Sequence, residues 1–305
     1  MDDIVYGRHA FTEPVLVEII DSAPVQRLKR ISQQGVPQKW NHIRTFMRYD
    51  HDIGTAILIA RVGGSLEEQV AGLLHDISHT AFSHLIDYVV GTGHKEDFQD
   101  RSFYRFLQSS EIPRILERHG YSARQFRDLH RFTLLEQEIP RLCADRLDYC
   151  FRQMAVDGEA DLVRRLAGSV AVSKGRLHFS SKRDALDFGR GYLRLQKHNW
   201  TAKETGARYQ LLVRAIRAAM KAGEITKEDF FTDDETMVGR LESSENPEVI
   251  ECLSDLTAGR LRYMKERNKL RYVDPTYIED GKVMVLSEEN LSYRKSVESL
   301  KRGHH

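Results

Sequence analysis

Long hydrophobic runs are missing from this chain of 305 residues. No stretch approaches the roughly 18 consecutive apolar residues of a membrane-spanning helix, and the start of the chain, with Asp2 and Asp3 and no apolar run, is not typical of a secretion signal. Cysteine is also scarce, and the three cysteines form no CxxC pair, so neither a disulfide framework nor a thiolate zinc site is expected. These absences predict a protein of a reducing compartment, which we expect in the cytoplasm and not at a membrane.

Net charge is nearly absent as well. The 46 Lys and Arg residues almost balance the 45 Asp and Glu residues, which leaves a formal net charge of +1 at pH 7. Such a balance provides no long-range attraction to a nucleic-acid backbone. Nucleic-acid binding is therefore not indicated, and a phosphate group would have to be bound by a local group of side chains.

Proline is the third scarce residue, with seven in the chain, and apolar residues recur mostly at helical spacing. Two segments differ. Residues 169–179 alternate around Lys174-Gly175, and two β-favouring runs between residues 275 and 286 are joined by Asp280-Gly281, as in β-hairpins. The sequence thus predicts a mainly α-helical protein with small β-hairpin additions in its C-terminal half.

No linker divides the chain, so the division into domains rests on these patterns. We expect a helical catalytic core over residues 1–165. Residues 166–305 are expected to form a mixed helical and hairpin extension that packs on the core.

The histidine and aspartate residues around His75-Asp76 are the most informative feature. The pair follows the apolar segment Gly72-Leu73-Leu74, which indicates that a buried helix presents it, and His79 returns to the same helix face. A lone histidine on an apolar face is more often a core residue than a ligand. An ionised aspartate buried beside imidazoles, however, needs a compensating cation or partner, so the group favours a metal site.

Three segments that follow one another in the sequence carry a family resemblance. They are Arg48-Tyr49-Asp50-His51, the block from His75 to His84, and Asp145-Arg146-Leu147-Asp148-Tyr149. Together they resemble the HD phosphohydrolase superfamily. Within it they look closest to the deoxynucleoside triphosphate triphosphohydrolases, the branch of the vertebrate SAM-and-HD-domain enzyme.

This resemblance implies a metal site made of His51, His75, Asp76 and Asp145. Two imidazoles and two carboxylates suit Mn, Fe, Zn, Ni or Co, while Mg accepts imidazole less readily. Four protein ligands on a six-coordinate ion leave positions for water and a phosphate oxygen, as in catalytic sites.

The resemblance also implies residues for catalysis and substrate binding. His84, supported by Asp87, would donate a proton to the leaving oxygen, and His79 and His94 would contact the reacting phosphate. The positions that match substrate-binding residues are Gln33, Arg48, Arg146, Tyr149, Tyr209 and Gln210. Plainer roles compete with two of these: helix packing for Tyr149, and a surface ion pair for Arg48.

Some positions depart from the triphosphohydrolase branch. The pair Gln33-Gln34 stands where the branch has Gln-Leu, so the apolar wall that excludes a ribose is missing. Thr201 stands where an arginine is expected, and Lys197 or Lys203 is near enough in sequence to replace it. The substrate is therefore less well predicted than the metal chemistry.

We expect a metal-dependent phosphohydrolase that acts on nucleotides, with a nucleoside triphosphate as the favoured substrate and a metal-activated water as the nucleophile. An HD nucleotidase or phosphodiesterase that cleaves another phosphate ester is the main alternative. A di-iron oxygenase, with His79 and His94 as extra ligands, and a non-catalytic nucleotide sensor are less favoured. The sequence does not determine whether the chain forms a homo-oligomer.

Overall fold

The computed structural model describes residues 1–263 and 270–304, and helices account for most of this part of the chain. The α-helices in the first half are α1 (Pro14–Asp21), α2 (Ala23–Arg27), α3 (Arg48–Arg61), α4 (Leu66–Leu74), α5 (Leu85–Val89), α6 (Phe98–Ser109), α7 (Ile112–Arg118) and α8 (Ala144–Val156). Those in the second half are α9 (Ala160–Gly168), α10 (Lys182–Leu195), α11 (Lys203–Lys221), α12 (Asp234–Glu242), α13 (Pro247–Ala258), α14 (Leu286–Glu289) and α15 (Leu291–His304).

Shorter helical turns connect these helices. The 3₁₀ turns are η1 (Leu28–Arg30), η2 (Ala123–Phe126), η3 (Leu129–Arg131) and η5 (Glu228–Phe231). A π-helical turn, η4 (Gln196–Trp200), follows α10 directly. Among the described residues the helices are all too short or too polar to span a membrane.

The β-structure is confined to two small sheets. One is the antiparallel pair β1 (Asp2–Asp3) and β2 (Gly7–Arg8). The other has the order β3-β4-β5-β6 and consists of β3 (Val170–Ser173), β4 (Arg176–Phe179), β5 (Thr276–Glu279) and β6 (Lys282–Val285). β3-β4 and β5-β6 are the two predicted hairpins, and a parallel contact between β4 and β5 joins them. The predicted fold class, mainly α with small hairpin additions, is confirmed.

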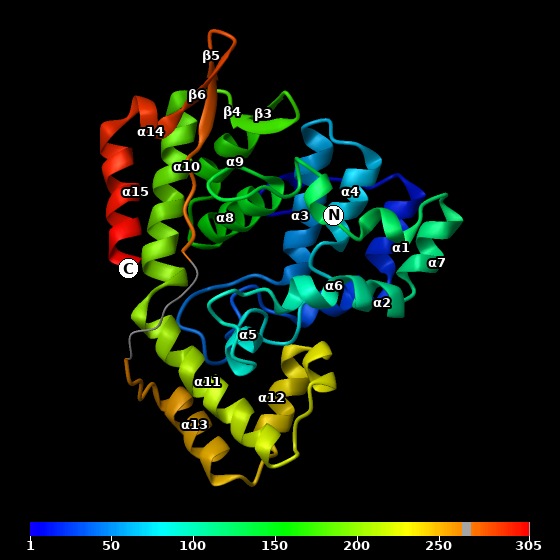
Figure 1. Ribbon diagram of the computed structural model, residues 1–305, viewed down its shortest axis with the longest axis vertical. Helices are drawn as coiled ribbons and strands as arrows, with labels where there is room; N and C mark the ends of the chain where they lie inside the picture. Colours follow the sequence, from blue (N-terminus) through cyan, green and yellow to red (C-terminus); the bar gives the residue numbers. More distant parts are fainter. Residues whose placement is uncertain (264–269, 305) are drawn as a thin grey trace.

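The turns of both hairpins have the backbone that their sequences indicate. Lys174 and Gly175 have φ values of 49° and 69°, and Asp280 and Gly281 have 50° and 73°. Two successive residues with positive φ match the right-handed twist of the flanking strands, which explains why Asp-Gly is frequent in such turns. Figure 1 shows the β5-β6 hairpin projecting from one end of the molecule.

Helix α3 is the central element of the N-terminal half. It packs against α4 and α8 (Figure 1), and every residue from His51 to Ile59 is buried. A helix that is buried on all sides belongs to the interior of a protein, so polar residues on it must find partners there. Three of the buried polar residues of α3, namely Arg48, His51 and Asp52, belong to the candidate site described below.

Two hydrophobic clusters stabilise the fold. The larger one contains apolar residues of α1, α3, α4, α8 and α10, together with Tyr277, Tyr293 and Val297 from the C-terminal part. The smaller one joins α5 to α11, α12 and α13. Both clusters draw on residues before and after position 165. The expected boundary between a core over residues 1–165 and an extension over 166–305 stays a prediction.

The smaller cluster also holds a strained loop. Phe82 and Ser83 have φ values of 61° and 48°, which are unfavourable for residues with side chains. The N–H of Phe82 donates to the Asp234 carboxylate at 2.8 Å, and the other oxygen of this carboxylate accepts from the N–H of Ser32 at 2.9 Å. Asp234, the first residue of α12, therefore fixes two loops that are 50 positions apart in the sequence.

Replacing Asp234 with alanine should destabilise the protein by about 2–4 kcal/mol, because two buried N–H groups would lose their acceptor. Urea denaturation monitored by circular dichroism measures this change. Glu235→Ala, at the exposed next position, is the matched control and should change stability by less than about 0.5 kcal/mol. Equal effects of the two substitutions would contradict the anchoring role of Asp234.

Candidate active site

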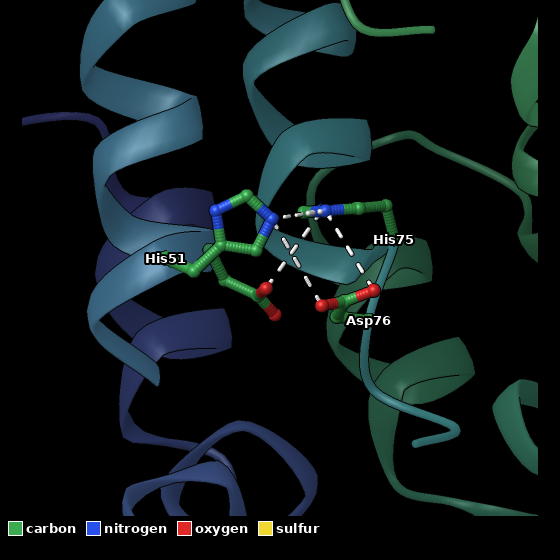
Figure 2. A group of neighbouring side chains, drawn as sticks. His51, His75 and Asp76 are labelled. Atoms are coloured by element: carbon green, nitrogen blue, oxygen red, sulfur yellow. Dashed lines mark hydrogen bonds and ion pairs between the residues drawn. The ribbon is translucent and has the colours of Figure 1, made fainter. Parts of the chain in front are cut away.

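The two imidazoles predicted to bind a metal are buried and lie next to each other. His51 lies on α3, and His75 follows the last residue of α4. Their Nε2 atoms are 3.2 Å apart, and the carboxylate of Asp76 lies beside both rings, as Figure 2 shows. The helix that was expected to present His75-Asp76 ends one residue earlier, at Leu74, so the pair lies in the turn at the helix end. It is nevertheless buried.

Helix α8 supplies the fourth predicted group. The Oδ1 atom of Asp145 is 3.0 Å from Nε2 of His51 and 3.7 Å from Nε2 of His75. The distances from Asp76 to the same two nitrogens are 4.0 Å and 3.7 Å. The four side chains therefore converge on one small volume, although Asp145 is 94 positions from His51.

Each imidazole is held from behind through its Nδ1 atom. Nδ1 of His51 donates to Asp148 at 2.8 Å, and Nδ1 of His75 donates to the carbonyl oxygen of Gly72 at 2.7 Å. These contacts fix the tautomer and leave Nε2 as the nitrogen that can bind a cation. In metal sites, the ligating histidines are commonly oriented by such hydrogen bonds from the ring nitrogen that does not bind the metal.

A further carboxylate, Asp52, lies in the same region and was not predicted from the sequence. His51, Asp52, His75 and Asp76 each provide an atom in a group whose members are all within 4.8 Å of one another. Asp52 is fully buried, and in the described part of the chain neither of its oxygens has a hydrogen-bond partner. Because Asp52 is 3.8 Å from Nδ1 of His75, it lies behind that ring.

The electrostatics of this cluster favour positive charge. Burial alone would lower the pKa of His51, but hydrogen bonds to Asp145 and Asp148 outweigh it and raise the pKa to about 9. For His75 the same effect of burial is outweighed by Asp76 and Asp52, and its pKa is also raised. A site whose carboxylates attract protons this strongly onto imidazoles also attracts a divalent cation. The residues therefore fit a metal ion of the type that N and O ligands bind.

The predicted proton donor lies next to this cluster. His84 precedes α5, and its Nδ1 atom is 3.5 Å from Oδ2 of Asp87. The other oxygen of Asp87 accepts from the N–H of Phe98 at 2.9 Å, which holds the carboxylate in place. His79 is 3.2 Å from Asp76, and its ring contacts that of His84 edge to face. Burial and the charge of Arg48 lower the pKa of His79 to about 3, so this imidazole is neutral near pH 7.

A cavity of about 490 Å³ opens over the cluster. His75, Asp76, Asp145, His79 and His84 lie in its wall. Further parts of the wall come from residues 33–48, 88–100 and 129–139, from α8, from η4 and the start of α11, and from Arg271. This volume is within the usual range of small-molecule sites.

Most of the residues predicted to contact substrate line this cavity, namely Gln33, Arg48, Arg146, Tyr149 and Tyr209. Gln34 lines it too, and its amide donates to the Gln153 side chain. Gln210 and His94 are not among the lining residues, and His94 is exposed.

The residues that sequence reasoning missed lie mostly behind the cluster. The side chain of Arg152 donates to Asp148 at 2.7 Å and to Asp3 at 2.6 Å, so a buried chain of charges runs from β1 to His51. Asp148 and Arg152 follow Asp145 at positions i+3 and i+7, on one face of α8. This helical spacing is the signal that could have identified them, whereas nothing in the sequence connects Asp3 to α8.

Comparison with known proteins agrees with this geometry. The HD domain family matches residues 48–152. A metal-dependent phosphohydrolase of Cordyceps militaris is 35% identical over 73% of this chain and 67% of its own length. A Bacillus subtilis protein named YdhJ is 38% identical over 98% of this chain and 94% of its length.

A solved structure of a phosphohydrolase from Bacteroides thetaiotaomicron has the same fold, with a TM-score of 0.70, 17% identity and coverage of 95% of this chain and 94% of that one. A more distant relative is the deoxynucleoside triphosphate triphosphohydrolase SAMHD1 of Bos taurus, which is 31% identical over 28% of this chain and 17% of its own length. The chain therefore belongs to the HD-domain family of metal-dependent phosphohydrolases. It is a hydrolase with a His and Asp site suited to a metal ion.

Gly54 provides a test of the contact between α3 and α8. A Cβ atom at this position would overlap the Arg152 guanidinium and the Asp148 carboxylate, so Gly54→Ala should displace the group that orients His51. We expect a loss of about 1–3 kcal/mol in stability and a lower metal content, measured by denaturation and by elemental analysis.

Gly239 is the matched control, because it also lies within a helix, and a Cβ there would meet nothing within 4 Å. Gly239→Ala should keep the metal and gain up to about 1 kcal/mol. A Gly54→Ala protein with full metal content would show that the α3–α8 contact does not orient the site.

Proposed function

We propose that this protein is a nucleotide triphosphohydrolase, which uses a divalent transition metal held by His51, His75, Asp76 and Asp145. The observation that carries the proposal is that His75, Asp76 and Asp145 lie in the wall of the cavity, with His51 against His75 and Asp145, next to the His84–Asp87 pair. A purely structural metal site needs neither a cavity nor a proton donor beside it.

The metal ligands are proposed from which ring nitrogens the protein itself already binds. The Nδ1 atoms of His51 and His75 are occupied by Asp148 and Gly72, so both Nε2 atoms are available to one ion. Asp145 and Asp76 complete a set of N and O ligands that suits Mn, Fe, Zn, Ni or Co. When bound, such an ion lowers the pKa of water and neutralises charge on phosphoryl oxygens.

The chain itself supplies the proton and the positioning. His84 is the proposed general acid, which donates to the oxygen of the leaving group, and Asp87, 3.5 Å from its Nδ1 atom, is the proposed orienting group. His79 is neutral, and its Nε2 atom lies 3.2 Å from Asp76, so its ring is the proposed group that keeps this carboxylate in place. Arg48 binds Asp76 and the Ser83 hydroxyl, and so ties the strained loop to the metal site.

The substrate class is proposed from the cavity and its lining. Its volume of about 490 Å³ can enclose a nucleotide, and Tyr149, Trp200 and Tyr209 provide aromatic surface in its wall. Gln33 and Gln34 offer amides to sugar hydroxyls, although Gln34 already donates to Gln153. The likeness to SAMHD1 supports a triphosphate, and attack at the α-phosphorus would release a nucleoside and inorganic triphosphate.

A screen of nucleoside mono-, di- and triphosphates with each divalent metal tests the substrate. We expect release of inorganic triphosphate from nucleoside triphosphates. Both ribose and deoxyribose forms should be accepted, because residue 34 is a glutamine and not an apolar residue that would exclude the 2′-hydroxyl. Ion chromatography of the products measures this. Release of orthophosphate alone, or activity restricted to monoesters, would replace the proposal with a nucleotidase or phosphodiesterase function.

Alanine variants separate metal binding from proton transfer. Asp76→Ala and His51→Ala should lose activity and bound metal together, since they remove ligands. His84→Ala should keep its metal and lose about 10²- to 10⁴-fold in kcat, because only the proton donor is removed. Elemental analysis and steady-state kinetics provide the two measurements.

The exposed His198 provides the control, and His198→Ala should match the wild type in both. Full metal content in Asp76→Ala would contradict the ligand set. Unchanged kcat in His84→Ala would remove the proposed acid and favour a nucleotide sensor. His94, which the sequence predicted as a phosphate contact, can be replaced by alanine in the same series.

A further inference from the structure

Among the described residues, three arginines line the cavity, and two of them are bound mainly to other groups of the protein. Arg48 donates to Asp76, to the Ser83 hydroxyl and to the carbonyl oxygen of Gln33, and its side chain is only 3% exposed. Its donors are thus engaged on the side of the metal cluster.

Arg146 is committed in a different way. Its Nη1 atom donates to the carbonyl of Arg141 at 2.6 Å and to Sγ of Cys143 at 3.1 Å. Its Nη2 atom donates to the carbonyl of Gln137 at 3.0 Å, and Glu136 is 3.6 Å away. With 8% of its side chain exposed, this guanidinium serves mainly to hold the loop before α8.

Arg271 differs from both. It lines the same cavity, 24% of its side chain is exposed, and its one hydrogen bond within the described part of the chain runs from Nη2 to the Glu96 carboxylate. Glu96 is buried, and its other oxygen accepts from the hydroxyl of Tyr88 at 3.3 Å. The carboxylate thereby fixes one edge of the guanidinium and leaves its other N–H groups for a ligand.

We propose that Arg271 binds a phosphate group of the substrate other than the one under attack, and so selects for a polyphosphate chain. The proposal rests on the proposed function, because it assumes that a phosphate ester enters this cavity. A guanidinium presents paired donors that match two phosphate oxygens, and the charge strengthens both bonds in a site shielded from water. Of the three described arginines in the cavity wall, Arg271 has the fewest hydrogen bonds to the protein, so it can bind a second phosphate with the fewest bonds broken.

The surroundings of Arg271 support an anionic ligand of limited size. Tyr149 and Tyr209 line the same cavity, and their hydroxyls are engaged by Tyr192 and by the Gln34 carbonyl. Rigid aromatic neighbours restrict where the guanidinium can move, which favours one position for the bound phosphate. Glu96 keeps Arg271 in place and would repel an anion bound on its own side, so the ligand is expected on the opposite edge.

The test compares Arg271→Gln with the wild type in two measurements. Calorimetry of the metal-loaded protein with inorganic triphosphate, at equal metal concentration in cell and syringe, should show binding weakened by about 10- to 100-fold. Orthophosphate, which has no second phosphate group, should bind equally to both proteins. In kinetics, KM for a nucleoside triphosphate should rise by a similar factor while kcat changes less than about threefold.

Arg271→Lys keeps the charge and should recover part of the affinity. Arg262→Gln, an exposed arginine nearby in the sequence, is the matched control and should behave as wild type. Unchanged triphosphate binding in Arg271→Gln would overturn the proposal, as would an equal loss of triphosphate and orthophosphate binding, which indicates a structural role.

The two proposals fail in distinguishable ways. If the wild type cleaves no nucleoside triphosphate but binds inorganic triphosphate through Arg271, the proposed function fails while the inference holds for another polyphosphate. If it cleaves nucleoside triphosphates and Arg271→Gln has the wild-type KM and affinity, only the inference fails.

Discussion

The contact between α3 and α8 is the constraint on which the site depends. It places Nε2 of His51 3.0 Å from Asp145 and Nδ1 of His51 2.8 Å from Asp148. The His51 side chain is fully buried. Carboxylates and imidazoles buried this closely are costly unless opposite charges accompany them. Arg152 compensates Asp148 on the inner side, and a metal ion is the group that would compensate the remaining carboxylates on the cavity side. Packing and metal binding are therefore parts of one electrostatic balance.

The same charge balance explains why parts of the chain far from α3 and α8 are needed to hold the site together. Arg152 is buried and would itself be costly without Asp3, which brings the N-terminal hairpin into the site. On the opposite side, the loop that carries His84 passes through positive φ at Phe82 and Ser83 and is held there by Asp234 of α12. Asp234 thus maintains a backbone geometry that the loop alone would not adopt.

The sequence predicted the elements whose signals are local. Helical periodicity and the turns at Lys174-Gly175 and Asp280-Gly281 predicted the fold class, and the motif around His75-Asp76 predicted a group that the structure brings together. The positions of Arg271 at the cavity and of Asp234 at the strained loop could not be predicted, because they come from packing between segments far apart in the sequence, which no short motif encodes. His94 shows the opposite case: it matches a motif by order along the chain, yet its side chain is exposed.

This division bears on how substrate choice arises in such a protein. The HD family match ends at residue 152, and within it the two cavity arginines, Arg48 and Arg146, are engaged by the protein's own carboxylates and carbonyls. These two arginines therefore have few N–H donors left to bind the parts of a substrate that do not react. On our proposal that task falls to residues outside the match, such as Tyr209 and Arg271, which line the same cavity from the C-terminal half. Relatives that share only the core can therefore share the metal chemistry and differ in substrate.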